Sequence, residues 1–178
     1  MHEEDRGRVW RLYGWYCALM TCGSCVGAVA WAARMTGLVN LFKANKASTR
    51  VEQMSLFVAV DSWQCVFLVT YAVEFLCLSA AKLMVLDRMS VFAAPQGIGM
   101  RRRWAAAGRI VMAVVVLGNT VGLAASITAA VSYQGAGISD NAYTALSVQK
   151  FCEVAVLLLI VVAFITVGVL SARRVSST

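Results

Sequence analysis

Two charged side chains lie inside a long apolar segment, and their types could support chemistry. The stretch from Tyr71 to Met89 reads YAVEFLCLSAAKLMVLDRM, in which Glu74 and Lys82 interrupt a run of apolar residues. A charged group at membrane depth costs about 2.5–3.5 kcal/mol on insertion scales. Glu74 is therefore expected to be protonated, paired or facing a watery cavity. It would either carry protons or cations, or hydrogen-bond across helices as neutral polar glue.

The spacing of these groups favours a structural role for Glu74. Lys82 follows eight residues later, which corresponds to about 80° of helical turn and about 12 Å of rise, so the two are not expected to pair. The Lys82 side chain is expected to extend to the membrane interface. Asn119 and Thr120 are the polar partners available on another segment. A single acid without a second acid, a histidine or a paired base is a poor proton relay.

A C-x-x-C motif, Cys22-Gly-Ser-Cys25, raises the alternative of thiol redox chemistry. Thiol exchange requires an accessible thiolate, whereas this motif lies in the middle of an apolar segment. Four-span thiol oxidoreductases of the vitamin K epoxide reductase type carry further cysteines in an extramembrane loop. The loops expected at 34–53 and 132–150 contain no cysteine.

Motifs for other catalytic sites are missing from the sequence. There is no G-x-x-x-x-G-K-[ST], G-x-S-x-G or H-E-x-x-H pattern, and the only histidine is His2. A haem or zinc site is not expected from this set of residues. The sequence thus predicts no catalytic residue, no metal site and no cofactor.

Composition places the whole chain in the membrane class. Of its 178 residues, 60% are hydrophobic and 14% charged, against about 45–50% and about 25% in soluble domains. Four segments reach the length of about 20 apolar residues that a membrane span needs. They cover residues 12–33, 62–86, 110–131 and 151–172, the last with Glu153 near its start. We predict an all-α membrane protein, a bundle of four transmembrane helices forming one domain over residues 1–178.

Capping signals predict an unusually long second helix. Thr49-x-x-Glu52 is a capping box, and no helix breaker follows it before Pro95. A helix from about Arg50 to Ala93 would be about 65 Å long, roughly twice the thickness of a bilayer core. We expect it to project from the bilayer. The connections are predicted at 94–99 (APQGIG) and 134–137 (QGAG), with N-caps for the fourth helix at 139–141 (SDN).

Basic residues predict the orientation. The net charge is +7, and the basic residues cluster beside apolar segments, which indicates membrane topology rather than nucleic-acid binding. One side would hold ten arginines and the other five lysines and arginines, so both termini are predicted to be cytoplasmic. The first segment has the flanks of a signal peptide, but its apolar run exceeds the roughly 7–15 residues of a signal core. A true span is the preferred interpretation.

Small residues at four-residue spacing predict close helix packing. Gly118, Gly122 and Ser126 form one such ladder, and Gly23 and Gly27 form a second. Small residues let helix backbones approach closely in lipid, where the hydrophobic effect does not drive helices together. The ladders predict tight neighbours, either within the chain or on another subunit.

A basic cluster precedes the third span. Arg101, Arg102 and Arg103 are followed by Trp104. Such a cluster helps to set the orientation of the helices in the membrane, or it attracts anionic lipid headgroups with about 1 kcal/mol per residue near a charged surface.

These features favour a membrane protein without a catalytic role. We expect an accessory or scaffolding subunit of a membrane assembly, or a self-associating protein, whose partners are the bilayer, anionic lipids and other membrane subunits. A proton- or cation-coupled transporter or channel subunit using Glu74 is the first alternative. A thiol oxidoreductase using Cys22 and Cys25 is the second, and a part of a larger multi-span architecture is the third.

Overall fold

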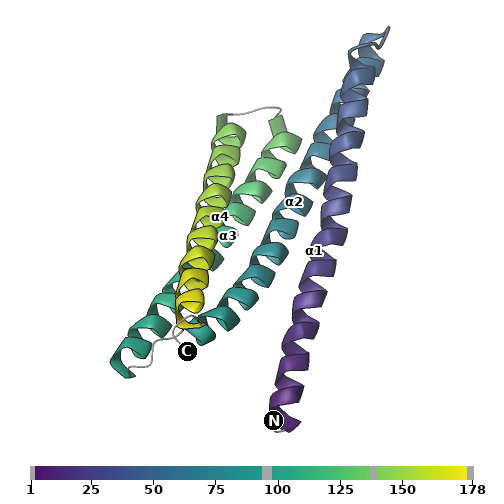
Figure 1. The fold of residues 1–178 in the computed structure, drawn as a ribbon. Coiled ribbons are helices and arrows are strands. Elements are labelled where there is room, and N and C mark those ends of the chain that lie inside the picture. Colours follow the sequence, from purple (N-terminus) through teal and green to yellow (C-terminus); the bar gives the residue numbers. More distant parts are fainter. Residues whose placement is uncertain (1–2, 94–97, 137–139, 176–178) are drawn as a thin grey trace.

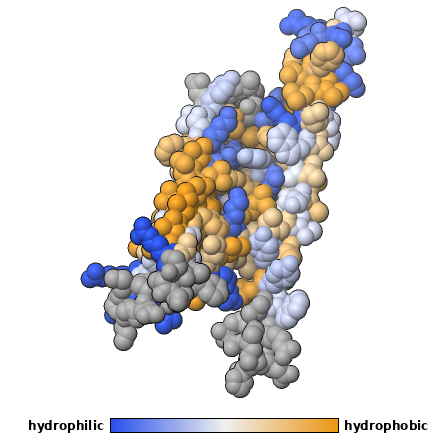
Figure 2. Space-filling model, in the orientation of Figure 1, coloured by the Kyte–Doolittle hydropathy of each residue, from blue (hydrophilic) through white to orange (hydrophobic). Residues whose placement is uncertain are grey.

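The computed structural model describes residues 3–93, 98–136 and 140–175, which are helical except for the connection at residues 45–49. The chain forms four helices: α1 (Glu3–Ala44), α2 (Arg50–Ala93), α3 (Ile98–Ala136) and α4 (Asp140–Val175). Each helix is long and apolar enough to cross a membrane. The predicted all-α class with four such helices is therefore confirmed. Figure 2 shows apolar side chains over much of the α4 surface and hydrophilic ones at the tip of the α1–α2 hairpin.

The predicted bounds of the long second helix are confirmed, and its start is capped. The backbone N–H of Glu52 donates to Thr49 Oγ1 at 3.4 Å, and that of Gln53 donates to the Thr49 carbonyl at 3.0 Å. α1 has 42 residues, nearly as many as the 44 of α2. At the end that carries the α1–α2 connection, both helices extend beyond the neighbouring ends of α3 and α4 (Figure 1).

The predicted connections were too long. α1 continues to Ala44, so the first connection spans only residues 45–49. Arg101 to Arg103 and Gln134 to Ala136 lie within α3 rather than in loops. No proline interrupts these ends, and a glycine inside a helix costs only about 1 kcal/mol relative to alanine, so the helices continue. Of the predicted caps of α4, Ser139 lies outside the described residues and Asp140 begins the helix.

α2 is the central helix of the arrangement. It packs against α1, α3 and α4, and α3 and α4 also pack on each other. Among the described residues, α1 packs against α2 alone. Successive helices alternate in direction, so the described ends nearest the two termini lie at the same end of the bundle (Figure 1). The side of α1 opposite α2 therefore has no neighbour among the described residues.

Glycines on α1 and α3 allow two of these contacts to be close. A Cβ added at Gly118 would lie 2.6 Å from Val156 Cγ2 of α4, and one at Gly23 would lie 3.2 Å from Cys77 Cβ of α2. Gly122 has more room, with 3.9 Å to Cys152 Cβ. Real side chains do not tolerate the first of these distances without movement. Both ladders therefore serve packing within the chain, and Gly118 is the tighter position on α3.

Candidate functional site

Glu74 points from α2 towards α1. A Cβ added at Gly27 would overlap its carboxylate, so Gly27 is the residue that makes room for this side chain. Glu74 Oε2 is buried and has no hydrogen-bond partner among the described residues. The side chain is thus held at a helix–helix junction where one of its oxygens receives no donor.

The polar partners expected on α3 bond within their own helix. Asn119 Nδ2 donates to the Val115 carbonyl at 2.8 Å, and Thr120 Oγ1 donates to the Val116 carbonyl at 2.9 Å. The structure thus gives no hydrogen bond from either residue to Glu74. A hydrogen bond between helices at Glu74 would therefore need a donor other than Asn119 or Thr120.

A second carboxylate contacts α2 from α4. Glu153 of α4 accepts from Gln149 Nε2 at 2.8 Å and from the Tyr71 hydroxyl at 3.5 Å, the long limit of such a bond. Tyr71 precedes Glu74 by three residues, which places the two near each other on the helix surface. The structure therefore brings a second acid within one helical turn of Glu74 along α2.

Two amide oxygens near this second acid have no donor. Asn119 is 8% exposed and Gln149 is 4% exposed, and Asn119 Oδ1 and Gln149 Oε1 are both buried without a partner. Asn119 and Glu153 line a cavity of about 10 Å³ together with Ala72, Phe75, Gly118, Gly122 and Leu123. This cavity lies where α2, α3 and α4 meet, and Asn119 and Glu153 are its polar lining residues.

Arg34 of α1 contacts Gln64 and an aromatic cluster rather than Glu74 or Glu153. Its Nη1 donates to Gln64 Oε1 at 2.6 Å, and its guanidinium lies 5.5 Å from the centroid of the Phe67 ring. Phe67 stacks on Tyr71 with 5.6 Å between ring centroids, and Trp31 meets Phe67 edge-on at 6.3 Å. These contacts fix Tyr71 from one side while its hydroxyl reaches Glu153.

The remaining charged residues of the prediction lie on the surface. Lys82 is exposed, as are Arg101, Arg102 and Arg103. The three arginines fall in the first turns of α3, where the helix dipole disfavours positive charge. Their stabilisation must come from outside the helix, by water or by anions.

The cysteines are all free. Cys22 and Cys25 of the C-x-x-C motif are exposed on α1. Cys77 of α2 is buried and is also a free thiol. Within the described residues, no group of three histidine, cysteine or acidic side chains is placed to hold a metal ion.

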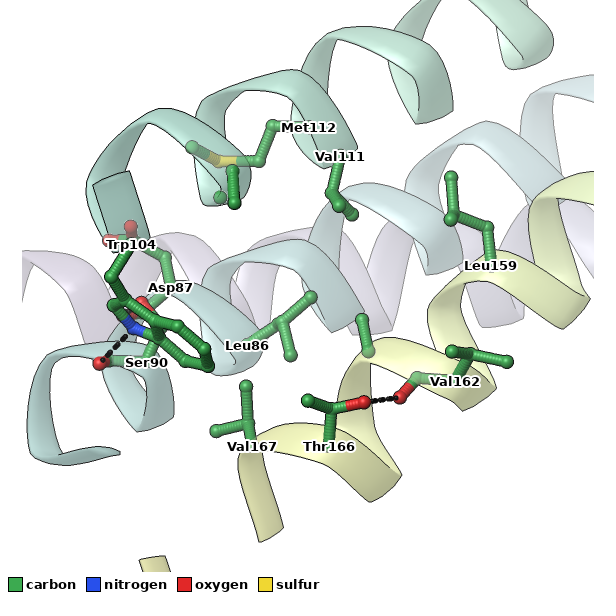
Figure 3. A pocket seen from close by; sticks show the side chains of 13 residues that line it. Leu86, Asp87, Ser90, Trp104, Val111, Met112, Leu159, Val162, Thr166 and Val167 are labelled. Atoms are coloured by element: carbon green, nitrogen blue, oxygen red, sulfur yellow. Dashed lines mark hydrogen bonds between the residues drawn. The ribbon is translucent and has the colours of Figure 1, made fainter. Parts of the chain in front are cut away.

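A larger cavity of about 210 Å³ lies between the ends of α2, α3 and α4 (Figure 3). Its walls are largely apolar, with Leu86, Val111 and Val167 among them. Asp87 and Ser90 lie at one end, where Trp104 Nε1 donates to the Ser90 carbonyl at 3.0 Å. The space suits an apolar group and offers no arrangement of reactive side chains.

Sequence reasoning missed Glu153 and Gln149 as site residues. Their spacing of four residues is a signal for a hydrogen-bonded pair on one helix face. The sequence alone does not reveal that Tyr71 of α2 and Asn119 of α3 lie beside this pair. No known protein family, curated protein or solved structure matches the chain.

The contact between Gly27 and Glu74 predicts a specific packing defect. Gly27→Ala should lower the free energy of unfolding by about 1–3 kcal/mol, because the added methyl group displaces a buried carboxylate. Gly14→Ala is the matched control, since a Cβ there meets nothing within 4 Å. Thermal and denaturant unfolding in detergent measure both variants.

A double-mutant cycle separates this contact from a general effect on α1. In a Glu74→Ala background, Gly27→Ala should cost at least about 0.5 kcal/mol less than in the native chain, because the overlapping group is gone. Equal costs in both backgrounds would show that the two residues are not coupled.

Proposed function

We propose that the chain is an integral membrane protein without a catalytic role, which acts as a scaffolding subunit by associating with a second copy of itself through α1. The observation that carries the proposal is that α1 packs against α2 alone among the described residues. A helix with one neighbour leaves most of its circumference for lipid or for a partner. The other three helices each pack against at least two helices.

Small residues form a strip on the exposed surface of α1, beside the exposed Val29 and Trp31. Ser24, Ala28 and Ala32 are exposed at four-residue spacing, and Thr21 and Cys25 are exposed beside them. Gly23, Gly27 and Ala30, by contrast, are buried against α2. Small residues and hydroxyl groups support close helix association in lipid, and a strip on one helix is self-complementary about a two-fold axis. These features favour a second copy as the occupant.

Membrane orientation forms part of the proposal. The described ends nearest both termini and the end of α2 lie at one end of the bundle (Figure 1), and the sequence places the larger share of arginines there. Both termini are therefore cytoplasmic under the positive-inside rule. Arg101, Arg102 and Arg103 then face anionic headgroups, which would offset their unfavourable position at the start of α3.

The interface on α1 can be tested with a cysteine already present in the chain. Mild oxidation of native membranes should give a disulfide-linked dimer through Cys25, because close helix approach brings the two copies of this residue within bonding range. Ala28→Leu should reduce the dimer by about tenfold, corresponding to about 1.4 kcal/mol. Val161→Leu, at an exposed position on α4, should leave it unchanged.

Cys25→Ser must abolish the product, which identifies the linkage. A dimer that forms equally in Ala28→Leu would exclude the α1 strip as the interface. A chain that stays monomeric in membranes, with no Cys25 product, would reject self-association altogether.

Topology is tested by single-cysteine labelling in a background without other cysteines. Ser48→Cys in the α1–α2 connection should react with a membrane-impermeant maleimide on intact cells. Arg101→Cys at the start of α3 should react only after permeabilisation. Reaction of both from the same side would eliminate the four-span arrangement.

Proton- or cation-coupled transport is the second candidate function. Two observations favour it. The first is the buried Oε2 of Glu74, which has no partner among the described residues. The second is that Glu153 of α4 accepts a hydrogen bond from Tyr71, which lies on α2 as Glu74 does. An ionisable residue within a membrane span often marks an ion pathway. The packing of Glu74 against Gly27 equally suits a static neutral carboxyl, so transport ranks second.

The substitution Glu74→Gln separates the two candidates, because it keeps the shape of the side chain and removes its ionisation. For a scaffold, the protein in vesicles of phosphatidylcholine and phosphatidylglycerol should show no proton or cation flux above empty vesicles. A pH-dependent flux in the native chain that disappears in Glu74→Gln would establish transport instead. Thermal unfolding of the variant confirms that the fold survives.

A further inference from the structure

The cavity of about 210 Å³ between the ends of α2, α3 and α4 changes in polarity along its length. Asp87, Ser90 and Trp104 lie together at one end, and Leu159 lies at the other (Figure 3). Leu159 belongs to the apolar run of α4, whereas Trp104 directly follows the three exposed arginines at the start of α3. The cavity therefore leads from a polar rim into the apolar part of the bundle.

The walls of the cavity suit hydrocarbon and disfavour water. Beyond the rim, the one polar lining residue is Thr166, whose hydroxyl already donates to the Val162 carbonyl at 2.8 Å. An apolar cavity of about 150 Å³ can stay dry and take up benzene, and this cavity is larger. It is also partly open to the outside of the bundle, where a membrane supplies acyl chains. Part of a lipid acyl chain is thus an occupant of suitable size and polarity.

Selection of one kind of lipid must come from its headgroup. An acyl chain alone gains nothing by leaving the bilayer for apolar side chains. The hydrogen bond from Trp104 Nε1 to the Ser90 carbonyl brings the start of α3 against the end of α2. The rim therefore carries Arg88 and residues 101–103 beside the single acid Asp87, and all of these side chains are exposed. Its excess of positive charge favours a headgroup with a net negative charge.

Helical spacing places Arg101 on the face of α3 that lines the cavity. Arg101 lies three residues before Trp104 and seven before Gly108, and both of those residues line the cavity. Positions at these spacings share one face of a helix. Arg102 lies about 100° further round the helix, away from that face. Arg101 is therefore the arginine best placed to contact the headgroup of a lipid whose acyl chain occupies the cavity.

We propose that this cavity binds one anionic phospholipid, with an acyl chain between α2, α3 and α4 and the headgroup phosphate at Arg101. A guanidinium group can bind two phosphate oxygens at once, which is the strong form of this contact. The negative headgroup also offsets the unfavourable position of positive charge in the first turns of α3. Trp104 closes the rim through its hydrogen bond to Ser90 at 3.0 Å, and its ring suits the level of the headgroups.

The site deepens the contact with anionic lipids in the proposed function, and it rests on the membrane setting proposed there. It is formed by α2, α3 and α4, whereas the proposed dimer interface lies on α1. Failure of lipid binding would leave the dimer linked through Cys25 unaffected. Failure of dimerisation would leave lipid binding intact, so the two assays report on the two proposals separately.

The experiment is native mass spectrometry of the purified full chain, titrated in detergent with phosphatidylglycerol or with phosphatidylcholine of the same acyl chains. The first phosphatidylglycerol molecule should bind at least about fivefold more tightly than the first phosphatidylcholine molecule, as expected for one arginine at an anionic headgroup. This step should saturate at one lipid per chain. Glycerophosphoglycerol, which is the headgroup without acyl chains, should not compete at the same concentrations, because it cannot fill the apolar cavity.

Variants assign the binding to the cavity and to its rim. Gly108→Leu fills the cavity without a steric conflict, because a Cβ at Gly108 meets nothing within 4 Å, and it should weaken binding of both lipids by about tenfold. Gly168→Leu is the matched control, since its Cβ also meets nothing within 4 Å and Gly168 does not line the cavity.

A second pair of variants tests the headgroup contact at constant net charge. Arg101→Gln should reduce the preference for phosphatidylglycerol by about fivefold. Arg102→Gln removes the same charge from the other face of α3, and it should reduce the preference by less than about twofold because salt screens more distant charges. Thermal unfolding confirms that each variant keeps the fold.

Four results would overturn the proposal. Equal affinity for phosphatidylglycerol and phosphatidylcholine would exclude selection by the headgroup. Competition by glycerophosphoglycerol alone would assign the site to a free phosphate compound. Binding to Gly108→Leu as tight as to the native chain would place the lipid outside the cavity. Equal losses in Arg101→Gln and Arg102→Gln would show general attraction to a basic surface instead of a site.

Discussion

Close approach of α2 to its neighbours is the constraint on which the rest of the structure depends. In lipid, an apolar side chain gains nothing by leaving the hydrocarbon for another helix, so packing and polar contacts must hold helices together. Glycines allow close packing between two pairs of helices: Gly23 and Gly27 bring α1 against α2, and Gly118 brings α3 against α4. A side chain at these positions would separate the backbones and remove the contacts that order the bundle.

The central position of α2 explains why its polar residues have different neighbours. Gln64 and Glu74 meet α1, through Arg34 and Gly27 respectively, while the Tyr71 hydroxyl meets Glu153 of α4. Seven residues separate Gln64 from Tyr71 and three separate Tyr71 from Glu74, so one stretch of helix surface serves two interfaces. The aromatic ring of Tyr71 packs on Phe67, and this ring contact holds the hydroxyl at the second interface.

The sequence predicts the helices, but it does not predict which helices pack against one another. The capping box at Thr49 and the absence of a breaker before Pro95 gave the correct bounds of α2, because capping and helix propagation are local. The lengths of α1 and α3 were underestimated because hydropathy marks the apolar part of a helix and not its polar ends. Residues 101–103 and 134–136 continue α3 for this reason.

The site itself depended on contacts that no local signal encodes. Glu74 was singled out because a charge in an apolar run is visible in the sequence. Glu153 lies near the start of its apolar segment, where a charge is ordinary, so its role emerged only from its proximity to Tyr71 and to the cavity lined by Asn119. A small-residue ladder likewise predicts a neighbour without identifying it.

The three unsatisfied polar atoms share one chemical character that connects the two acids. Glu74 Oε2, Asn119 Oδ1 and Gln149 Oε1 are all acceptors, and they are the complete set of buried, unpartnered side-chain atoms among the described residues. The donors of the cluster are directed to other acceptors: Gln149 Nε2 and the Tyr71 hydroxyl donate to Glu153, and Asn119 Nδ2 donates to the Val115 carbonyl. In folded proteins, buried polar groups without a protein partner are commonly satisfied by buried water.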